Sequence, residues 1–148
     1  MLKHTAFIFF ILLWQLTAAQ GKKTPVKIMS ATTQDWVGGA KGMSGITYTV
    51  KVRILCDNPV EFSTLWLDKQ SVPFEVQTFF TDPNKKPVAG DSVLLVYVKR
   101  TPAKAGETTN TPLPFQYKGE ALLHYTVAGK PKYIVIKNFS KLKIIKGV

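Results

Sequence analysis

ITYTVKVRILC, residues 46–56, has the most regular hydrophobic pattern in this chain. Apolar and polar side chains alternate along it with a period of two, which is typical of a β-strand with one buried and one solvated face. Thr47, Lys51 and Arg53 belong to the solvated face. The opposite face is predicted to pack into the core and consists of Ile46, Tyr48, Val50, Val52, Ile54 and Cys56.

Further strands are predicted on both sides of this segment, at the spacing typical of all-β sandwiches. Residues 57–59 (Asp-Asn-Pro) indicate a turn, and residues 101–114, rich in Pro, Thr and Gly, indicate a long exposed loop. The remaining strands are expected at 25–32, 60–67, 72–80, 92–99, 120–127 and from 132 onward. About seven to eight strands predict an all-β fold, a single antiparallel β-sandwich of immunoglobulin-like type, with a small closed β-barrel as the alternative.

The first nineteen residues have the organisation of a secretory signal peptide. Lys3 and His4 supply a positive start, residues 6–14 form an apolar run too short to span a bilayer, and Ala19 is a small residue at the expected cleavage position. We therefore expect residues 1–19 to be removed and residues 20–148 to form one β-sandwich domain. The protein is expected to be exported, to the periplasm or the extracellular space.

Two further features concern the compartment. No later apolar run is long enough for a membrane helix, so no stable membrane span is expected. Cys56 is the only cysteine, and a single cysteine cannot close a disulfide within the chain. An exported small domain without a disulfide is more typical of a bacterial envelope than of an animal extracellular space.

The chain is strongly basic, with 20 Lys and Arg against 9 Asp and Glu and a formal net charge of +11 at pH 7. Such a charge favours anionic partners, and an anionic polysaccharide or an envelope protein is expected here rather than nucleic acid. The alternative is that the lysines only keep a β-rich protein soluble and protect its sheet edges.

Lysines are most frequent at the C-terminal end of the chain. A terminal hairpin is expected there, with its return strand starting at Lys132 and an irregularity at 138–140, so that Lys137, Lys141 and Lys143 would share a solvated face. Residues 130–148 contain no acidic residue. The candidate anion-binding residues are Lys130, Lys132, Lys137, Lys141, Lys143 and Lys146.

Residues for enzyme chemistry are few. His124 is the only histidine after the signal peptide, Cys56 is predicted to be a small buried hydrophobe, and the acidic residues are scattered singly. Acid–base catalysis and transition-metal binding both need several such groups together. We therefore expect no catalytic residue, no cofactor site and no metal site.

The glycine-rich segment 36–45 is predicted to connect two strands. Its glycines lack the spacing of a phosphate-binding loop, and a strand rather than a helix follows it. Trp36, at the start of this segment, is a candidate aromatic contact for a sugar or a peptide.

Several short motifs together resemble small secreted β-proteins of Bacteroidetes bacteria. These motifs are Ala18-Ala19-Gln20, Trp36-Val37-Gly38-Gly39 with Gly45-Ile46-Thr47-Tyr48, Leu65-Trp66, and Tyr117-Lys118-Gly119-Glu120-Ala121. The resemblance implies an envelope location and a sandwich fold. It implies no activity and no site residues.

The leading functional hypothesis is a secreted or periplasmic non-enzymatic binding module with a basic surface, for anionic glycans or other polyanions. The second is a structural or accessory envelope protein that docks a protein partner by sheet-edge pairing. The third is an enzyme whose site is assembled from scattered residues. Steep salt dependence of binding would favour the first hypothesis over the second.

Overall fold

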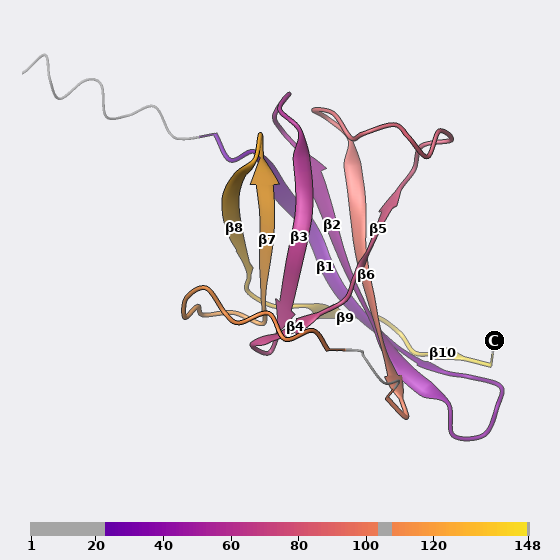
Figure 1. Cartoon of the computed structure of the whole chain (residues 1–148). Helices are drawn as coiled ribbons and strands as arrows, with labels where there is room; N and C mark the ends of the chain where they lie inside the picture. The colour runs from indigo at the N-terminus through magenta and orange to yellow at the C-terminus, as the bar shows by residue number, and fades with distance from the viewer. Residues whose placement is uncertain (1–22, 104–107, 148) are drawn as a thin grey trace, which may run out of the picture.

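The computed structural model describes residues 23–103 and 108–147, and this part of the chain contains strands and connecting segments but no helix (Figure 1). The predicted signal peptide therefore lies outside the described residues. The strands are β1 (Val26–Val37), β2 (Ser44–Ile54), β3 (Val60–Leu67), β4 (Gln70–Val72), β5 (Glu75–Thr78), β6 (Ser92–Thr101), β7 (Ala121–Val127), β8 (Lys130–Ile136), β9 (Ser140–Lys141) and β10 (Ile145–Lys146).

The strands form two sheets that face each other, as the all-β prediction requires. One sheet has the order β10-β1-β2-β6-β5, with β9 also paired to β1, and the other has the order β4-β3-β7-β8. In an immunoglobulin constant-type domain, strands A, B, E and D form one sheet and C, F and G the other. β1, β2, β6 and β5 take the first set of positions and β3, β7 and β8 the second. The fold is therefore an open, immunoglobulin-like β-sandwich and not a closed barrel.

The core lies between the sheets and contains the face of β2 that the alternation predicts. Val50, Val52 and Ile54 are fully buried and belong to one apolar cluster with residues of both sheets, such as Leu95 of β6 and Leu123 of β7. Ile46, Tyr48 and Cys56 are only half-buried. Ile46 and Cys56 lie near the ends of β2. Tyr48 lies within the strand, where its ring stacks on Tyr97 and meets Phe139 edge-on.

The predicted strand 72–80 is wrong, because two short strands in different sheets occupy this region. β4 pairs with β3, whereas β5 pairs with β6. Pro73 lies between them and has no N–H to donate to a ladder, so pairing stops where the chain crosses from one sheet to the other. The expected common face is lost, and Val76 is exposed while Val72 is buried.

The predicted terminal hairpin is correct only as far as Ile136. β7 and β8 pair as expected, but the chain then leaves this sheet and runs along the outer edge of β1, with which β9 and β10 pair in parallel. Phe139 anchors the crossing, because its ring packs edge-on against Tyr48 at 5.4 Å between centroids and its N–H donates to the Glu120 carboxylate.

The predicted exposed loop 101–114 is confirmed in its described part, where only Leu113 is half-buried and no strand follows Thr101. Its later residues cross the outer face of the β3–β7 pair. Thr111 accepts a hydrogen bond from Trp66 Nε1 at 3.0 Å, and Thr109 bonds to Ser71. Trp66 is paired with Leu122 in the sheet, and both are buried although they lie outside the main core cluster. A second, smaller apolar layer therefore forms on the outside of this sheet.

The burial of β2 predicts unequal effects for two adjacent residues. Ile54→Ala should lower the free energy of unfolding by about 2–5 kcal/mol, because it removes buried methyl groups and leaves a cavity. Ile54 is 0% exposed, whereas Leu55 is 47% exposed. Leu55→Ala is the matched control and should change stability by less than about 0.5 kcal/mol. Chemical denaturation of both variants measures the difference, and equal losses would contradict this assignment of the core.

Candidate functional site

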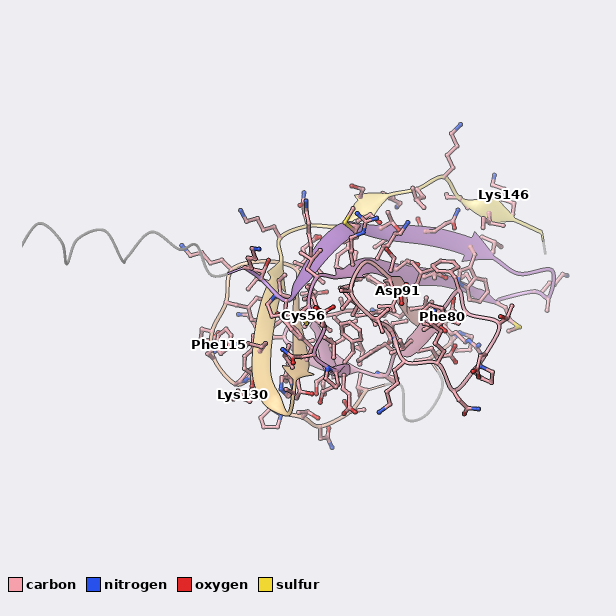
Figure 2. All side chains as sticks on the ribbon, turned by 90° about the horizontal axis from the view of Figure 1, so that it is seen from above. Cys56, Phe80, Asp91, Phe115, Lys130 and Lys146 are labelled. Atoms are coloured by element: carbon pink, nitrogen blue, oxygen red, sulfur yellow. The ribbon has the colours of Figure 1, made fainter. Side chains whose placement is uncertain are left out.

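The six candidate lysines do not form one line of charge. Lys130 and Lys132 lie on β8 at the β7–β8 turn, and Lys137 follows the end of the same strand. Lys141, Lys143 and Lys146 lie instead along the outer edge of β1. Figure 2 shows Lys130 and Lys146 at opposite ends of the molecule. The predicted solvated face of Lys137, Lys141 and Lys143 is therefore absent, because the strand on which it depended ends at Ile136.

Lys141 is partly neutralised by an acidic neighbour. Its Nζ lies 2.7 Å from a carboxylate oxygen of Asp35, and its side chain is 68% exposed. An exposed ion pair of this kind contributes only about 0–1 kcal/mol to stability. The pair does reduce the positive charge that Lys141 could offer to an anion.

Trp36 lines a largely apolar surface groove. The groove has a volume of about 560 Å³ and is formed by the end of the β1–β2 hairpin together with β10. Its nine described lining residues include no acidic residue; they are Gln34, Trp36, Val37, Gly38, Gly39, Ala40, Met43, Thr47 and Ile145. Val37, Met43 and Ile145 are each more than 40% exposed, so this end of the sheet presents apolar side chains to solvent.

The position of the Trp36 indole depends on Gly45. The two residues are opposite each other in the β1–β2 ladder, so their side-chain positions are on the same face of the sheet. A Cβ atom at residue 45 would lie 2.5 Å from Cζ2 of Trp36 and 2.5 Å from the carbonyl oxygen of Lys99, closer than atoms can approach. The missing side chain at Gly45 therefore provides the space in which the six-membered ring of the indole lies.

The C-terminal segment forms one wall of the groove. Ile145 is the register partner of Trp36, and Lys146 is the partner of Val37. Gln34 Nε2 donates a hydrogen bond of 3.0 Å to the carbonyl of Lys143. Lys146 directly follows a lining residue, and so does Lys41 in the hairpin loop. The groove thus combines an aromatic ring with apolar walls, and Lys41 and Lys146 are neighbours of its lining residues in sequence.

Sequence reasoning identified Trp36 but missed the residues that make a groove around it. Met43 and Ile145 lie far apart in sequence, and Ile145 reaches the site only because β10 pairs in parallel with β1. A two-residue strand has no periodicity that a sequence pattern could reveal. The one available signal was the apolar pair Ile144-Ile145 among lysines.

A second pocket, of about 260 Å³, bears on the enzyme hypothesis because two carboxylates line it. Its lining includes Tyr48, Asp68, Glu120 and Lys141. Glu120 already accepts a hydrogen bond from the Phe139 N–H, so it has a structural role in holding the chain crossing after β8. In the described ranges, no group of three or more His, Cys, Asp or Glu is arranged to hold a metal ion.

His124 and Cys56 are not brought together. The His124 ring stacks on Tyr133 of β8 with 4.8 Å between centroids, and its Nε2 is buried with no hydrogen-bond partner among the described residues. Cys56 follows β2 in the other sheet, and its thiol donates to the Asn58 carbonyl at 3.6 Å. Within the part of the chain that the structure describes, neither residue has the base or carboxylate partner that nucleophilic or acid–base catalysis needs.

The packing of Trp36 on Gly45 can be tested with a single methyl group. Gly45→Ala should displace the indole, shift the fluorescence of Trp36 to longer wavelength and lower stability by about 1–3 kcal/mol through overpacking. Phe at the other two tryptophan positions isolates the signal. Gly42→Ala is the control for the Trp36 spectrum alone, because no atom lies within 4 Å of a Cβ built there. It is no control for stability, since its φ of +82° makes any side chain at this position costly. An unchanged Trp36 spectrum in Gly45→Ala would contradict the packing.

The environment of Tyr48 predicts loss of stability at high pH. Burial, followed by the negative charges of Asp68, Glu120 and Asp35, raises the pKa of Tyr48 above its usual value of 10.0. The folded state therefore holds this proton to higher pH than the unfolded state does. The resulting stabilisation is present below pH 10 and is lost as pH rises through the raised pKa. Denaturation between pH 9 and about 12 should show a shallower decline for Tyr48→Phe than for the parent protein.

Comparisons with known proteins add no relative to this description. No known family model matches the chain, and neither a curated protein nor a solved structure matches it. In the described part of the chain, no helix has the length and apolar character needed to cross a membrane. The function of the candidate site must therefore be inferred from the geometry of its residues.

Proposed function

We propose that this protein is an exported, non-enzymatic binding module that holds an anionic glycan in the groove around Trp36. The observation that carries the proposal is the placement of the Trp36 indole on Gly45, beside Met43 and Ile145, in an apolar groove at one end of the sandwich. The support for export comes from the amino-acid sequence, in which residues 1–19 have the organisation of a signal peptide.

The groove suits a sugar because it combines an aromatic side chain with a few polar groups. The C–H faces of a pyranose ring pack well on an indole, whose π-face carries partial negative charge. Gln34 and Thr47 line the same groove and can hydrogen-bond to hydroxyl groups. Its volume of about 560 Å³ falls within the range of small-ligand sites.

The charge around the groove favours an acidic sugar over a neutral one. Lys41 and Lys146 each follow a lining residue, and Lys143 bonds through its carbonyl to Gln34. No acidic residue lines the groove, and Asp35, the acidic residue next to Trp36 in sequence, is paired with Lys141. Carboxylate or sulfate groups on the glycan would therefore meet a positive potential.

Binding to heparin and to polygalacturonate, measured by calorimetry at several salt concentrations, tests the proposal. Trp36→Ala should weaken binding at least about fivefold, because stacking on one aromatic ring contributes about 1–3 kcal/mol. The charge change Lys143→Glu with Lys146→Glu should weaken binding and reduce its salt dependence, since each removes a contact that releases a counterion.

The matched control is Lys130→Glu with Lys132→Glu, which changes net charge by the same amount at the opposite end of the molecule. We expect this pair to retain most of the affinity. Equal losses in the two charge variants, with no effect of Trp36→Ala, would mean that the protein binds polyanions through net charge alone and would overturn the proposed site. Absence of binding to both polymers at low salt would reject the anionic-glycan class.

A further inference from the structure

The C-terminal part of β6 has one edge that β5 does not cover. β5 is four residues long and pairs only with residues 93–96 of β6. β6 continues to Thr101, and over residues 97–101 its one described strand partner is β2. Five residues of strand correspond to about 17 Å of edge, enough for a short extended peptide.

The hydrogen-bond alternation identifies the backbone groups at this edge. In β2, both the N–H and the carbonyl of Ile54 bond toward the β6 side, whereas the Leu55 N–H bonds toward the β1 side. Alternation along an antiparallel ladder then directs the even-numbered residues of β2, and with them the odd-numbered residues of β6, into the β2–β6 ladder. Val98 and Arg100 consequently direct their N–H and carbonyl groups toward the open edge.

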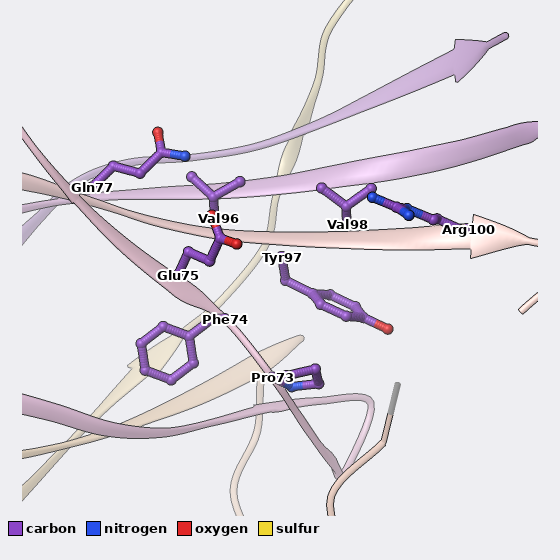
Figure 3. A pocket seen from close by; sticks show the side chains of 8 residues that line it. All are labelled: Pro73, Phe74, Glu75, Gln77, Val96, Tyr97, Val98 and Arg100. Atoms are coloured by element: carbon purple, nitrogen blue, oxygen red, sulfur yellow. The ribbon is translucent and has the colours of Figure 1, made fainter. Parts of the chain in front are cut away.

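A groove lies beside these groups. It has a volume of about 410 Å³, and its lining includes Pro73, Phe74, Val98 and Arg100 (Figure 3). Phe74 and Pro73 lie on the same side of the β6 ribbon as Tyr97, and Val98 lies on the other side. The groove therefore offers apolar contacts to side chains on both faces of an added strand.

The outer edges of β1 and β8 are less suited to strand addition than this edge of β6. β9 and β10 cover the edge of β1 at residues 32–33 and 36–37. Before Thr32 this edge carries a β-bulge between Ile28 and Ser30, and a bulge disfavours strand addition. β8 begins with Lys130, Pro131 and Lys132, and lysine and proline both disfavour strand addition at an edge. β6 extends beyond the end of its pairing with β5, and this open part of its edge carries Lys99 and Arg100, both exposed.

The positive charges of Lys99 and Arg100 determine what kind of strand could pair with this edge. A second copy of this basic chain, pairing through the same edge, would bring Lys99 and Arg100 close to their own copies, and opposed like charges destabilise a ladder. An acidic segment would meet these two cations favourably. We propose that the open edge of β6, at Val98 and Arg100, docks an extended acidic segment of a partner protein by strand addition. This interaction is separate from the Trp36 groove and does not rest on its glycan ligand.

The experiment uses the full chain and a labelled octapeptide of alternating valine and glutamate, with fluorescence anisotropy as the readout. The control peptide has lysine in place of glutamate. Val98→Pro removes the edge N–H and leaves the residues bonded to β2 unchanged, so it should weaken binding at least about tenfold. Val98→Thr keeps the N–H and the β-branched shape, and it should bind within about twofold of the parent.

Amide hydrogen exchange on the parent protein provides a readout that does not depend on a variant's folding. Peptide binding should slow exchange at Val98 and Arg100, and Trp36→Ala should leave the peptide affinity unchanged. Equal binding of the acidic and basic peptides, full affinity in Val98→Pro, or protection confined to β8 would each overturn the proposal. If Trp36→Ala weakens heparin binding but keeps the peptide affinity, the two sites are distinct. If the parent protein does not bind heparin at all, the peptide result is unaffected.

Discussion

The burial of one face of β2 between two sheets is the constraint on which the rest of the structure depends. Val50, Val52 and Ile54 are fully buried, and β2 is paired along its length with β1 on one side and β6 on the other. A register slip of one residue would place Lys51 and Arg53 in the core, so the pairing of three strands follows from one alternating pattern. With a single unpaired cysteine, Cys56, the described fold is held by this packing and not by a covalent link.

The parts of the fold that could be predicted are those with long periodic strands. The alternation in 46–56 and the apolar run in 92–99 identify the central strands. The total number of predicted strands indicates a sandwich. β4, β5, β9 and β10 have two to four residues each, too few for any periodicity. Their places are set by partners far away in sequence, such as Trp36 for Ile145. For the same reason Trp36 could be proposed as a contact residue from sequence, but its groove could not.

Both proposed sites occur where neighbouring strands differ in length. β1 and β2 continue to Val37 and Ser44, and only β10 lies along the outer edge of β1 at that end, which leaves the Trp36 groove between hairpin and strand. β6 continues past β5, which leaves a groove and two residues with backbone groups directed outward. An immunoglobulin-like sandwich can thus acquire binding surfaces without a change in its core, since the strand ends and edges are free to vary in length.

The basic residues behind the net charge of +11 do not all have the same role, because they lie in different structural settings. Lys130 and Lys132 flank a proline at the free edge of β8, where their charge disfavours pairing with other strands. Lys141 is engaged with Asp35. Lys99 and Arg100 lie at an edge that remains open, where the same positive charge that opposes self-association favours an acidic partner. The position of each basic residue in the ladder therefore decides whether its charge protects an edge, pairs with an acidic side chain or stays at an open edge.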